Sequence, residues 1–197
     1  MEVFPMKFTT KNLVIMAFFV ALSVALLYII HFPIFPAAPF LEYDPADIPI
    51  LIGGFAFGPV VGIILTVVAS GIQALTVSAH SGVYGFIMHV IATSTLVVVA
   101  SVIYRIKHTR VGAVIGLVSG TIAMGLVMML ANHFITPLFM GVSADVVDAM
   151  LLPVILPFNL IKAGGNSLIT FFVYKAVSKY IVHGERLGRG KSSTSKA

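Results

Sequence analysis

The segment LPFNLIKAGGNSLITFFVYK, residues 156–175, places Lys162 in the middle of a run that is otherwise apolar and uncharged as far as Tyr174. At the centre of a membrane helix such a charge costs about 2.5 to 3.5 kcal/mol on the translocon insertion scale. Ionisable residues at these positions usually face the interior of the helix bundle and mark a functional site. The segment therefore predicts a membrane helix whose lysine has a specific partner.

The composition is that of a membrane protein. Hydrophobic residues make up 59% of the 197 residues, charged residues make up 10%, and the mean hydropathy is +1.08. A soluble domain has roughly a quarter of charged residues, and a water-soluble fold of this length could not bury so much apolar surface. Cysteine is absent, which excludes disulfides and thiolate metal sites.

The apolar windows predict an all-α membrane protein, a bundle of six transmembrane helices. Five windows approach the roughly 20 residues that a spanning helix needs. They cover residues 13–30, 60–77, 83–104, 111–131 and 157–174. Residues 148–156, with Pro153, are expected to be an approach segment to the last helix, because proline disfavours a helix interior.

The second helix is predicted over residues 48–57 and is short. Asp44-Pro45 and Asp47 offer capping chemistry at its start, and Gly58-Pro59 marks its end. At a rise of about 1.5 Å per residue it is too short to cross a bilayer alone. The loop before it, residues 31–47, is rich in proline and aromatic residues and is either an ordered external lid or a simple connector.

The distribution of charges indicates that the short helix counts as a crossing. With six crossings and a cytoplasmic N-terminus, 11 of the 12 basic residues lie inside, as the positive-inside rule requires. Five of the seven acids then lie outside. The sequence thus predicts a multi-pass protein of the cell membrane with both termini cytoplasmic. This topology explains the excess of basic residues, so no nucleic-acid partner is needed to account for it.

Two parts of the chain differ in composition. Residues 1–183 form the predicted six-helix substrate-binding domain, and residues 184–197 form a predicted disordered basic cytoplasmic tail. The tail contains GRGKSS, which resembles the end of a phosphate-binding loop but lacks the earlier glycine and the preceding strand. No ATPase activity is expected of this chain.

Polar residues within the predicted helices point to a binding site. Asn159, Lys162 and Asn166 lie at i, i+3 and i+7 and therefore share one helix face. Asn132 lies at the outer end of the preceding span. We predict that the four converge in the outer part of the membrane, beneath the acidic loop at 31–47. Alternatively, Lys162 reaches the outer headgroups and the asparagines link helices.

No sequence motif supports an enzymatic function. The sequence lacks H-E-x-x-H, G-x-S-x-G and a pair of acids within the spans. A hydrolase built on Ser143 or Ser167 with a distant histidine remains as an alternative. A stand-alone ion-coupled carrier would more often show a membrane carboxylate and repeated halves. The sequence therefore favours a membrane protein that binds a solute and takes its energy from a partner.

Four stretches resemble the riboflavin-specific substrate-binding subunits, or S components, of energy-coupling factor (ECF) transporters. They are LEYDPADIPILIGGFAFGP (41–59), GVYGFIMH (82–89), NHFITPLFMG (132–141) and FNLIKAGGNSLITFFVYK (158–175), within a match that covers most of residues 10–183. The most specific parts are Asp-Ile-Pro, Asn-x-x-x-Thr-Pro and Phe-Asn-x-x-Lys. His89 stands where the resemblance leads us to expect asparagine.

The resemblance implies six helices with a ligand pocket near the outer face, capped by the first external loop. It implies riboflavin as the transported ligand, no cofactor, and as partners a membrane coupling subunit and two cytoplasmic ATPases. Members of the family dock through small residues of the first helix, which here are Ala17, Ala21 and Ala25. The alternative for these alanines is packing inside the bundle, since small residues four apart serve both purposes.

The chemistry of the candidate residues agrees with a flavin. Asparagine would meet its amide-like edge, Lys162 its carbonyl oxygens, and Tyr43 or a phenylalanine its ring. Met88 and His89, about one turn into their helix, are further candidates, although a packing role suits His89 equally. Thiamine fits poorly because Lys162 would repel its charge and no span contains a compensating acid. Biotin competes, because a buried lysine pairs with a carboxylate.

Overall fold

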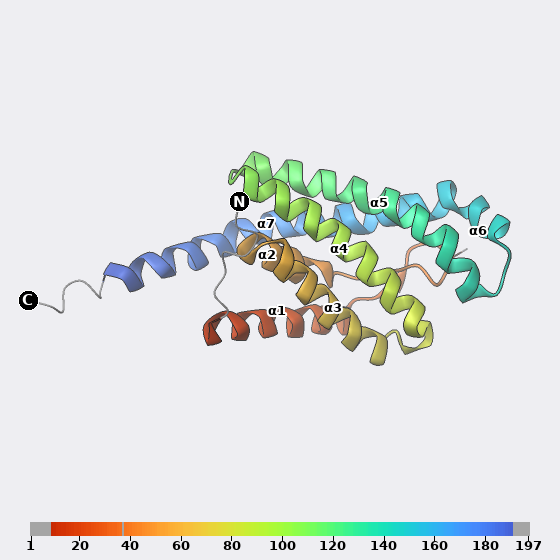
Figure 1. Ribbon diagram of the computed structural model, residues 1–197, viewed down its shortest axis with the longest axis horizontal. Coiled ribbons are helices and arrows are strands. Elements are labelled where there is room, and N and C mark those ends of the chain that lie inside the picture. The colour runs from red at the N-terminus through yellow and green to blue at the C-terminus, as the bar shows by residue number, and fades with distance from the viewer. Residues whose placement is uncertain (1–8, 37, 191–197) are drawn as a thin grey trace, which may run out of the picture.

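The structure is a computed structural model that describes residues 9–36 and 38–190, and within them the chain forms a bundle of helices (Figure 1). The bundle helices are α1 (Thr10–Ile29), α2 (Asp47–Phe57), α3 (Pro59–Leu75), α4 (Gly82–Ile106), α5 (Arg110–Met140) and α7 (Leu156–Gly190). Shorter elements connect them: strands β1 (Phe32–Pro33) and β2 (Glu42–Tyr43), turns η1 (Ala79–Ser81) and η2 (Leu151–Ile155), and helix α6 (Ala144–Met150).

Four helical segments in the described part of the chain are long and apolar enough to cross a membrane. They are Thr10–Ile29, Ala79–Ile106, Arg110–Met140 and Ala144–Tyr174, while α2 and α3 are shorter apolar helices. The predicted bundle of six helices with a short second one is therefore confirmed. The loop between α1 and α2 forms an antiparallel hairpin in which Phe32 pairs with Tyr43.

Helix α5 is longer than the sequence analysis predicts. It continues through Pro137 to Met140, so Asn132 lies within the helix and not at the end of a span that stops at residue 131. Proline removes one backbone donor without stopping this helix. The stop is Gly141, which adopts a left-handed conformation with φ of 68° and donates its N–H to the carbonyl of Pro137.

The approach to the last helix is also more regular than expected. Residues 148–156 complete α6 and then form a single π turn, η2, that leads directly into α7. Pro157 is the second residue of α7 and directly follows the π turn in this continuous helical run. Helix α7 continues to Gly190, past the predicted start of the tail at residue 184, and residues 191–197 lie outside the described residues. The division into domain and tail stays a prediction.

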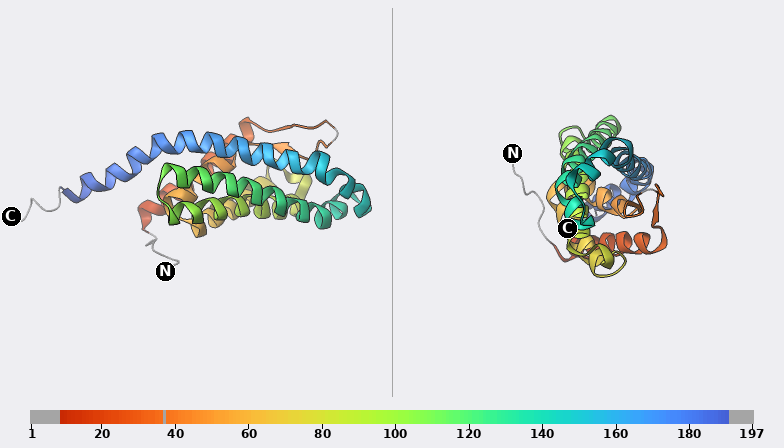
Figure 2. Two further views of the ribbon diagram at one scale, coloured as in Figure 1. Left: turned by 90° about the horizontal axis from the view of Figure 1, so that it is seen from above. Right: turned by 90° about the vertical axis from the view of Figure 1, so that its right-hand side faces the viewer.

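Opposite charges occupy opposite ends of the bundle (Figures 1 and 2). The start of α1 and the α4–α5 turn, with Arg105, Lys107 and Arg110, lie at one end. The hairpin, η1 and α6 lie at the other, and they contain the acidic residues Glu42, Asp145 and Asp148. We call these the basic end and the acidic end.

Close packing holds the helices in register. A Cβ atom at Gly116 would lie 2.6 Å from the carbonyl oxygen of Ala100, and one at Gly120 would lie 2.8 Å from that of Leu96. These glycines therefore let α5 approach the backbone of α4, as expected for small residues four apart.

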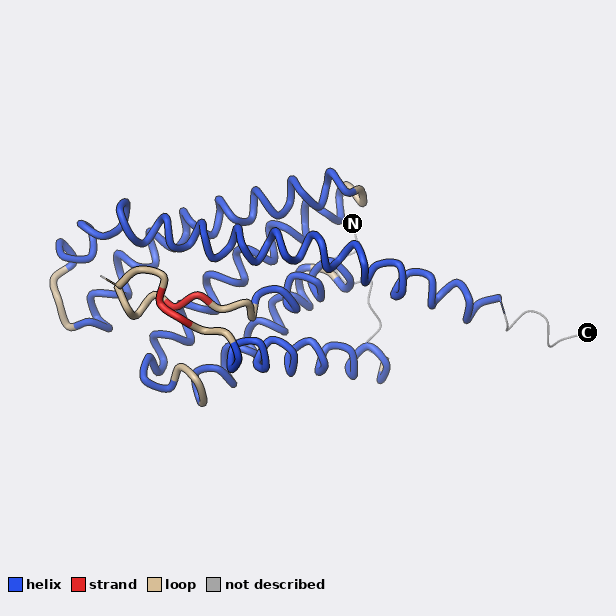
Figure 3. Tube along the Cα trace, turned by 180° about the vertical axis from the view of Figure 1, so that it is seen from behind, coloured by secondary structure: helices blue, strands red, loops and turns tan. Residues whose placement is uncertain are grey.

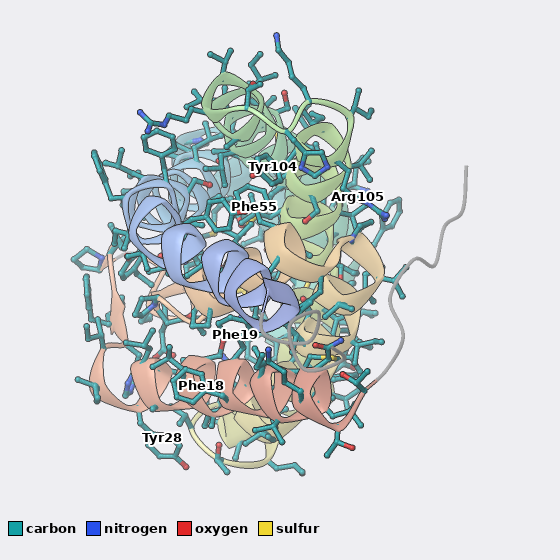
Figure 4. All side chains as sticks on the ribbon, turned by 90° about the vertical axis from the view of Figure 1, so that its left-hand side faces the viewer. Phe18, Phe19, Tyr28, Phe55, Tyr104 and Arg105 are labelled. Carbon is teal, nitrogen blue, oxygen red and sulfur yellow. The ribbon has the colours of Figure 1, made fainter. Side chains whose placement is uncertain are left out.

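At the basic end, aromatic rings join three helices (Figure 4). Phe55 of α2 packs on Tyr104 of α4 and Tyr174 of α7, with ring centroids 4.8 and 5.3 Å away, and the two tyrosine hydroxyls lie 3.1 Å apart.

Candidate functional site

The partner of Lys162 is Asp44, which lies in the loop between α1 and α2. Lys162 Nζ donates a hydrogen bond to Asp44 Oδ2 at 2.6 Å and a longer one to the backbone oxygen of Glu42 at 3.4 Å. Lys162 is 7% exposed and Asp44 is 2% exposed, so both charges are buried. The lysine therefore does not reach the headgroups. Removing one member of such a pair leaves an uncompensated buried charge, which costs about 3 to 5 kcal/mol.

The environment keeps Asp44 ionised. Burial by itself raises the pKa of Asp44, but the charge of Lys162 and hydrogen bonds from Lys162 and the backbone N–H of Ala46 bring it below its ordinary value. A carboxyl group with a lowered pKa contributes stability above its ordinary pKa of about 3.9 and loses it as the pH falls through the lowered value. The ion pair is therefore intact throughout the neutral range.

Asn166, one turn along α7, fastens the loop a second time. Its Nδ2 donates to the carbonyl of Asp44 at 3.0 Å and to Asp47 Oδ2 at 2.9 Å. Its Oδ1 accepts a hydrogen bond from the hydroxyl of Tyr43 at 3.0 Å. One fully buried asparagine thus joins α7 to the hairpin and to the first turn of α2. Figure 3 shows the two strands of the hairpin in red.

Asp47 extends this network to α3 and α4. Its Oδ1 accepts a hydrogen bond from Thr93 at 2.6 Å and lies 4.0 Å from His89 Nε2. His89 Nδ1 in turn lies 2.8 Å from Ser70 Oγ. Among the described residues, His89 Nε2 has no hydrogen-bond partner. His89 therefore packs through one ring nitrogen and keeps the other available.

The remaining two asparagines bond to residues four positions away in the chain. Asn132 Nδ2 donates to the carbonyl of Met128 at 2.8 Å, and its Oδ1 accepts from Thr136 at 2.7 Å. Asn159 Nδ2 donates to the carbonyl of Ile155 at 2.8 Å. Both side chains are buried, with 1% and 2% exposure. These local bonds fix the orientation of two amides that do not hold the loop.

A cavity opens beneath the loop, between α3, α4, α5 and α7. Of the residues predicted from sequence, Met88, His89, Asn132, Asn159 and Lys162 line it, whereas Tyr43 and Asn166 do not. Other lining residues were not among the predicted ones, including Phe40, Asp44, Gln73, Tyr84, Met128 and Phe139. Asp44 had a signal in the sequence, as an acid close to the predicted short helix, but that position suggested only a helix cap.

The two aspartates change one argument made from the sequence. Thiamine was disfavoured partly because no span contains an acid to balance Lys162. The loop brings Asp44 into contact with Lys162, and Asp47 lies behind it, bonded to Asn166. The absence of an acid from the spans therefore does not exclude a cationic ligand, and charge balance has to be judged on the assembled pocket.

A multi-pass helical bundle with a polar pocket under an ordered loop defines a membrane protein that binds a solute. The chain belongs to the family of substrate-specific components of ECF transporters, whose sequence pattern matches residues 11–174. The predicted resemblance to these S components is thereby confirmed.

Relatives and a solved structure agree with this assignment. The chain is 27% identical over 177 residues to the riboflavin transporter RibU of Staphylococcus aureus, covering 87% of this chain and 92% of that protein. It is 26% identical over 161 residues to the riboflavin transporter FmnP of Bacillus subtilis, covering 77% and 84%. A structure described as "Structure and mechanism of the S component of a bacterial ECF transporter" superposes with a TM-score of 0.76 at 28% identity, covering 87% and 97%.

The family assignment fixes the general function. The protein is the substrate-binding subunit of a transporter and has no catalytic activity of its own, which confirms the prediction of a transport subunit and excludes the hydrolase alternative. Membership also implies an energy-coupling module as partner.

We expect Asn166→Ala to release the loop without disturbing the pocket wall. The substitution removes three hydrogen bonds between α7 and the loop or α2, and each buried group left unpaired costs about 1 to 3 kcal/mol. Amide hydrogen exchange of residues 41–47 in detergent should accelerate at least about tenfold, the equivalent of 1.4 kcal/mol. Asn159→Ala is the matched control, because the hydrogen bond of Asn159 goes to Ile155 in the preceding turn and not to the loop. Equal exchange rates of residues 41–47 in the two variants would show that Asn166 does not hold the loop.

Proposed function

We propose that this chain captures riboflavin at the outer face of the cell membrane and delivers it through a membrane coupling subunit driven by two cytoplasmic ATPases. The observation that carries the proposal is the pocket itself, in which Asn132 of α5 and Asn159 and Lys162 of α7 line a cavity of mixed polar and apolar character. The names of the relatives support the same ligand, since RibU and FmnP are both riboflavin transporters.

The pocket suits a flat, uncharged ring system with polar edges. Met124, Met128 and Phe158 supply apolar surface for the faces of a ring. Asparagine offers both a donor and an acceptor, which matches the alternating carbonyl and N–H groups of a flavin edge. Lys162 has donor capacity beyond its bond to Asp44, because an ammonium group carries three protons.

The orientation in the membrane follows from the charges at the two ends. Arg105, Lys107 and Arg110 lie at the basic end, and basic residues favour the cytoplasmic side. The acidic end, with the loop and the pocket entrance, would then face outward. This orientation gives the loop the role of an external lid over the captured vitamin.

The first helix supplies a surface for the coupling subunit. Ala17, Ala21 and Ala25 are all exposed on the outside of the bundle, so packing within the bundle does not account for them. On the same helix Phe19 points inward while Phe18 and Tyr28 point outward (Figure 4). A row of small residues on an exposed membrane helix permits close approach of another helix.

We expect the purified protein to bind riboflavin more tightly than biotin or thiamine, without changing it chemically. Titration calorimetry in detergent with the three vitamins measures this directly. Riboflavin should be preferred because the pocket combines apolar faces with amide edges and already neutralises Lys162. Tighter binding of biotin or thiamine would refute the ligand assignment while leaving the family assignment intact.

Replacing Ala17 and Ala21 with leucine should abolish vitamin uptake in cells and leave riboflavin affinity in detergent within about twofold of the original. Bulky side chains prevent the close helix approach that docking requires, and neither residue lines the pocket. The matched control replaces both alanines with serine, which remains small and should preserve uptake. Normal uptake by the leucine variant would show that the coupling subunit docks elsewhere.

A further inference from the structure

We infer that Asp44 determines the charge selectivity of the pocket: by neutralising Lys162, it makes the site reject anionic ligands in favour of uncharged ones. The inference rests on the proposed function, since it concerns discrimination between flavins of different charge at the same site.

The geometry gives Asp44 this role because its carboxylate occupies the position that a ligand anion would take. Asp44 and Lys162 both line the pocket, and their charged atoms lie 2.6 Å apart. A buried lysine without a partner attracts carboxylates and phosphates strongly. With Asp44 in place, an anion gains little from Lys162 and is repelled by the carboxylate.

Other charges near the pocket add to this effect. Glu42 also lines the pocket, and Asp47 lies behind it with hydrogen bonds to Thr93 and Asn166. Among the described residues that line the pocket, Lys162 is the single lysine, and there is no arginine. Within the described lining, His89 is the other side chain that becomes cationic on protonation, and its Nε2 lies 4.0 Å from Asp47 Oδ1. The assembled site therefore has no excess of positive charge for an anion.

Asp44 is also held in place, so an incoming anion cannot simply displace it. Its Oδ1 accepts a hydrogen bond from the N–H of Ala46 at 3.0 Å, and its carbonyl accepts one from Asn166. The loop around it is anchored by Ala38 and Leu41, which pack with Val147, Ile155 and Phe158 in a small apolar cluster. Moving the carboxylate away from Lys162 would require the loop to lose these contacts.

Riboflavin and riboflavin 5′-phosphate form a matched pair of probes. They share the ring and differ by a phosphate that carries about −1.5 to −2 charges near neutral pH. The measured quantity is the ratio of the two dissociation constants, phosphate ester over riboflavin, determined by calorimetry in detergent at fixed low ionic strength. Steric effects of the phosphate cancel when this ratio is compared between variants.

Asp44→Asn should lower the ratio about tenfold or more, because removing one charge within about 10 Å of an anion has an effect of this size at an effective dielectric constant of about 20. Asp145→Asn is the matched control: it makes the same change at an exposed position of the same end and should leave the ratio unchanged. Lys162→Gln should raise the ratio, and this opposite shift provides a second test if Asp44→Asn fails to fold.

The possible results separate the inference from the function on which it rests. A ratio that is unchanged in Asp44→Asn, or that shifts equally in Asp145→Asn, overturns the inference while riboflavin binding stands. A ratio that does not rise in Lys162→Gln overturns it as well. If the original protein binds neither flavin, the proposed function falls, and the inference falls with it.

Discussion

The buried ion pair between Lys162 and Asp44 is the constraint on which the structure of the acidic end depends. A lysine inside a membrane bundle has to be compensated, and the nearest acid comes from a loop, not from another helix. Satisfying the lysine therefore requires the loop to fold back onto α7. Asn166, Tyr43 and Asp47 complete the attachment, and the polar network continues through Thr93 and His89 to α4.

This arrangement couples the ordering of the loop to the formation of the pocket. The loop closes the acidic end of the cavity, and the residues that hold it lie beside the residues that line the cavity. At the basic end, by contrast, Phe55, Tyr104 and Tyr174 pack α2, α4 and α7 together through their rings. The bundle thus has an aromatic contact at one end and a polar, loop-dependent closure at the other, where a solute enters under the proposed orientation.

Much of the fold was predictable because the membrane restricts the choice of structure. Backbone groups in lipid must be bonded within helices, so apolar length identified the long helices. The short second helix was identified by the signals at its two ends, and the number of crossings stays a prediction from the charges. Boundaries were less predictable: the apolar window ends at residue 131, but α5 continues through Pro137, and Gly141, with its left-handed backbone, is the residue that ends the helix. Local sequence signals do not reveal whether Pro137 or Gly141 ends the helix.

The site was predictable where it follows from one helix and less so where it depends on tertiary contact. Helical spacing placed Asn159, Lys162 and Asn166 on one face, and all three are buried inside the bundle. Spacing did not show that Asn166 faces the loop while Asn159 lines the cavity. Nor did it show that Asp44 meets Lys162, because the two residues are 118 positions apart and no periodicity connects a loop to a distant helix.

The most direct test of the central claim is a double-mutant cycle on the apparent unfolding temperature in detergent, using Asp44→Asn, Lys162→Gln and the double variant. Each single substitution leaves a buried charge without its partner, which costs about 3 to 5 kcal/mol, whereas the double substitution leaves none. If the ion pair forms, the double variant should lose less stability than the two single variants lose together. It should also be at least as stable as the less stable of the two single variants. Strictly additive losses would show that Lys162 and Asp44 do not interact, and would contradict this account of how the loop is held.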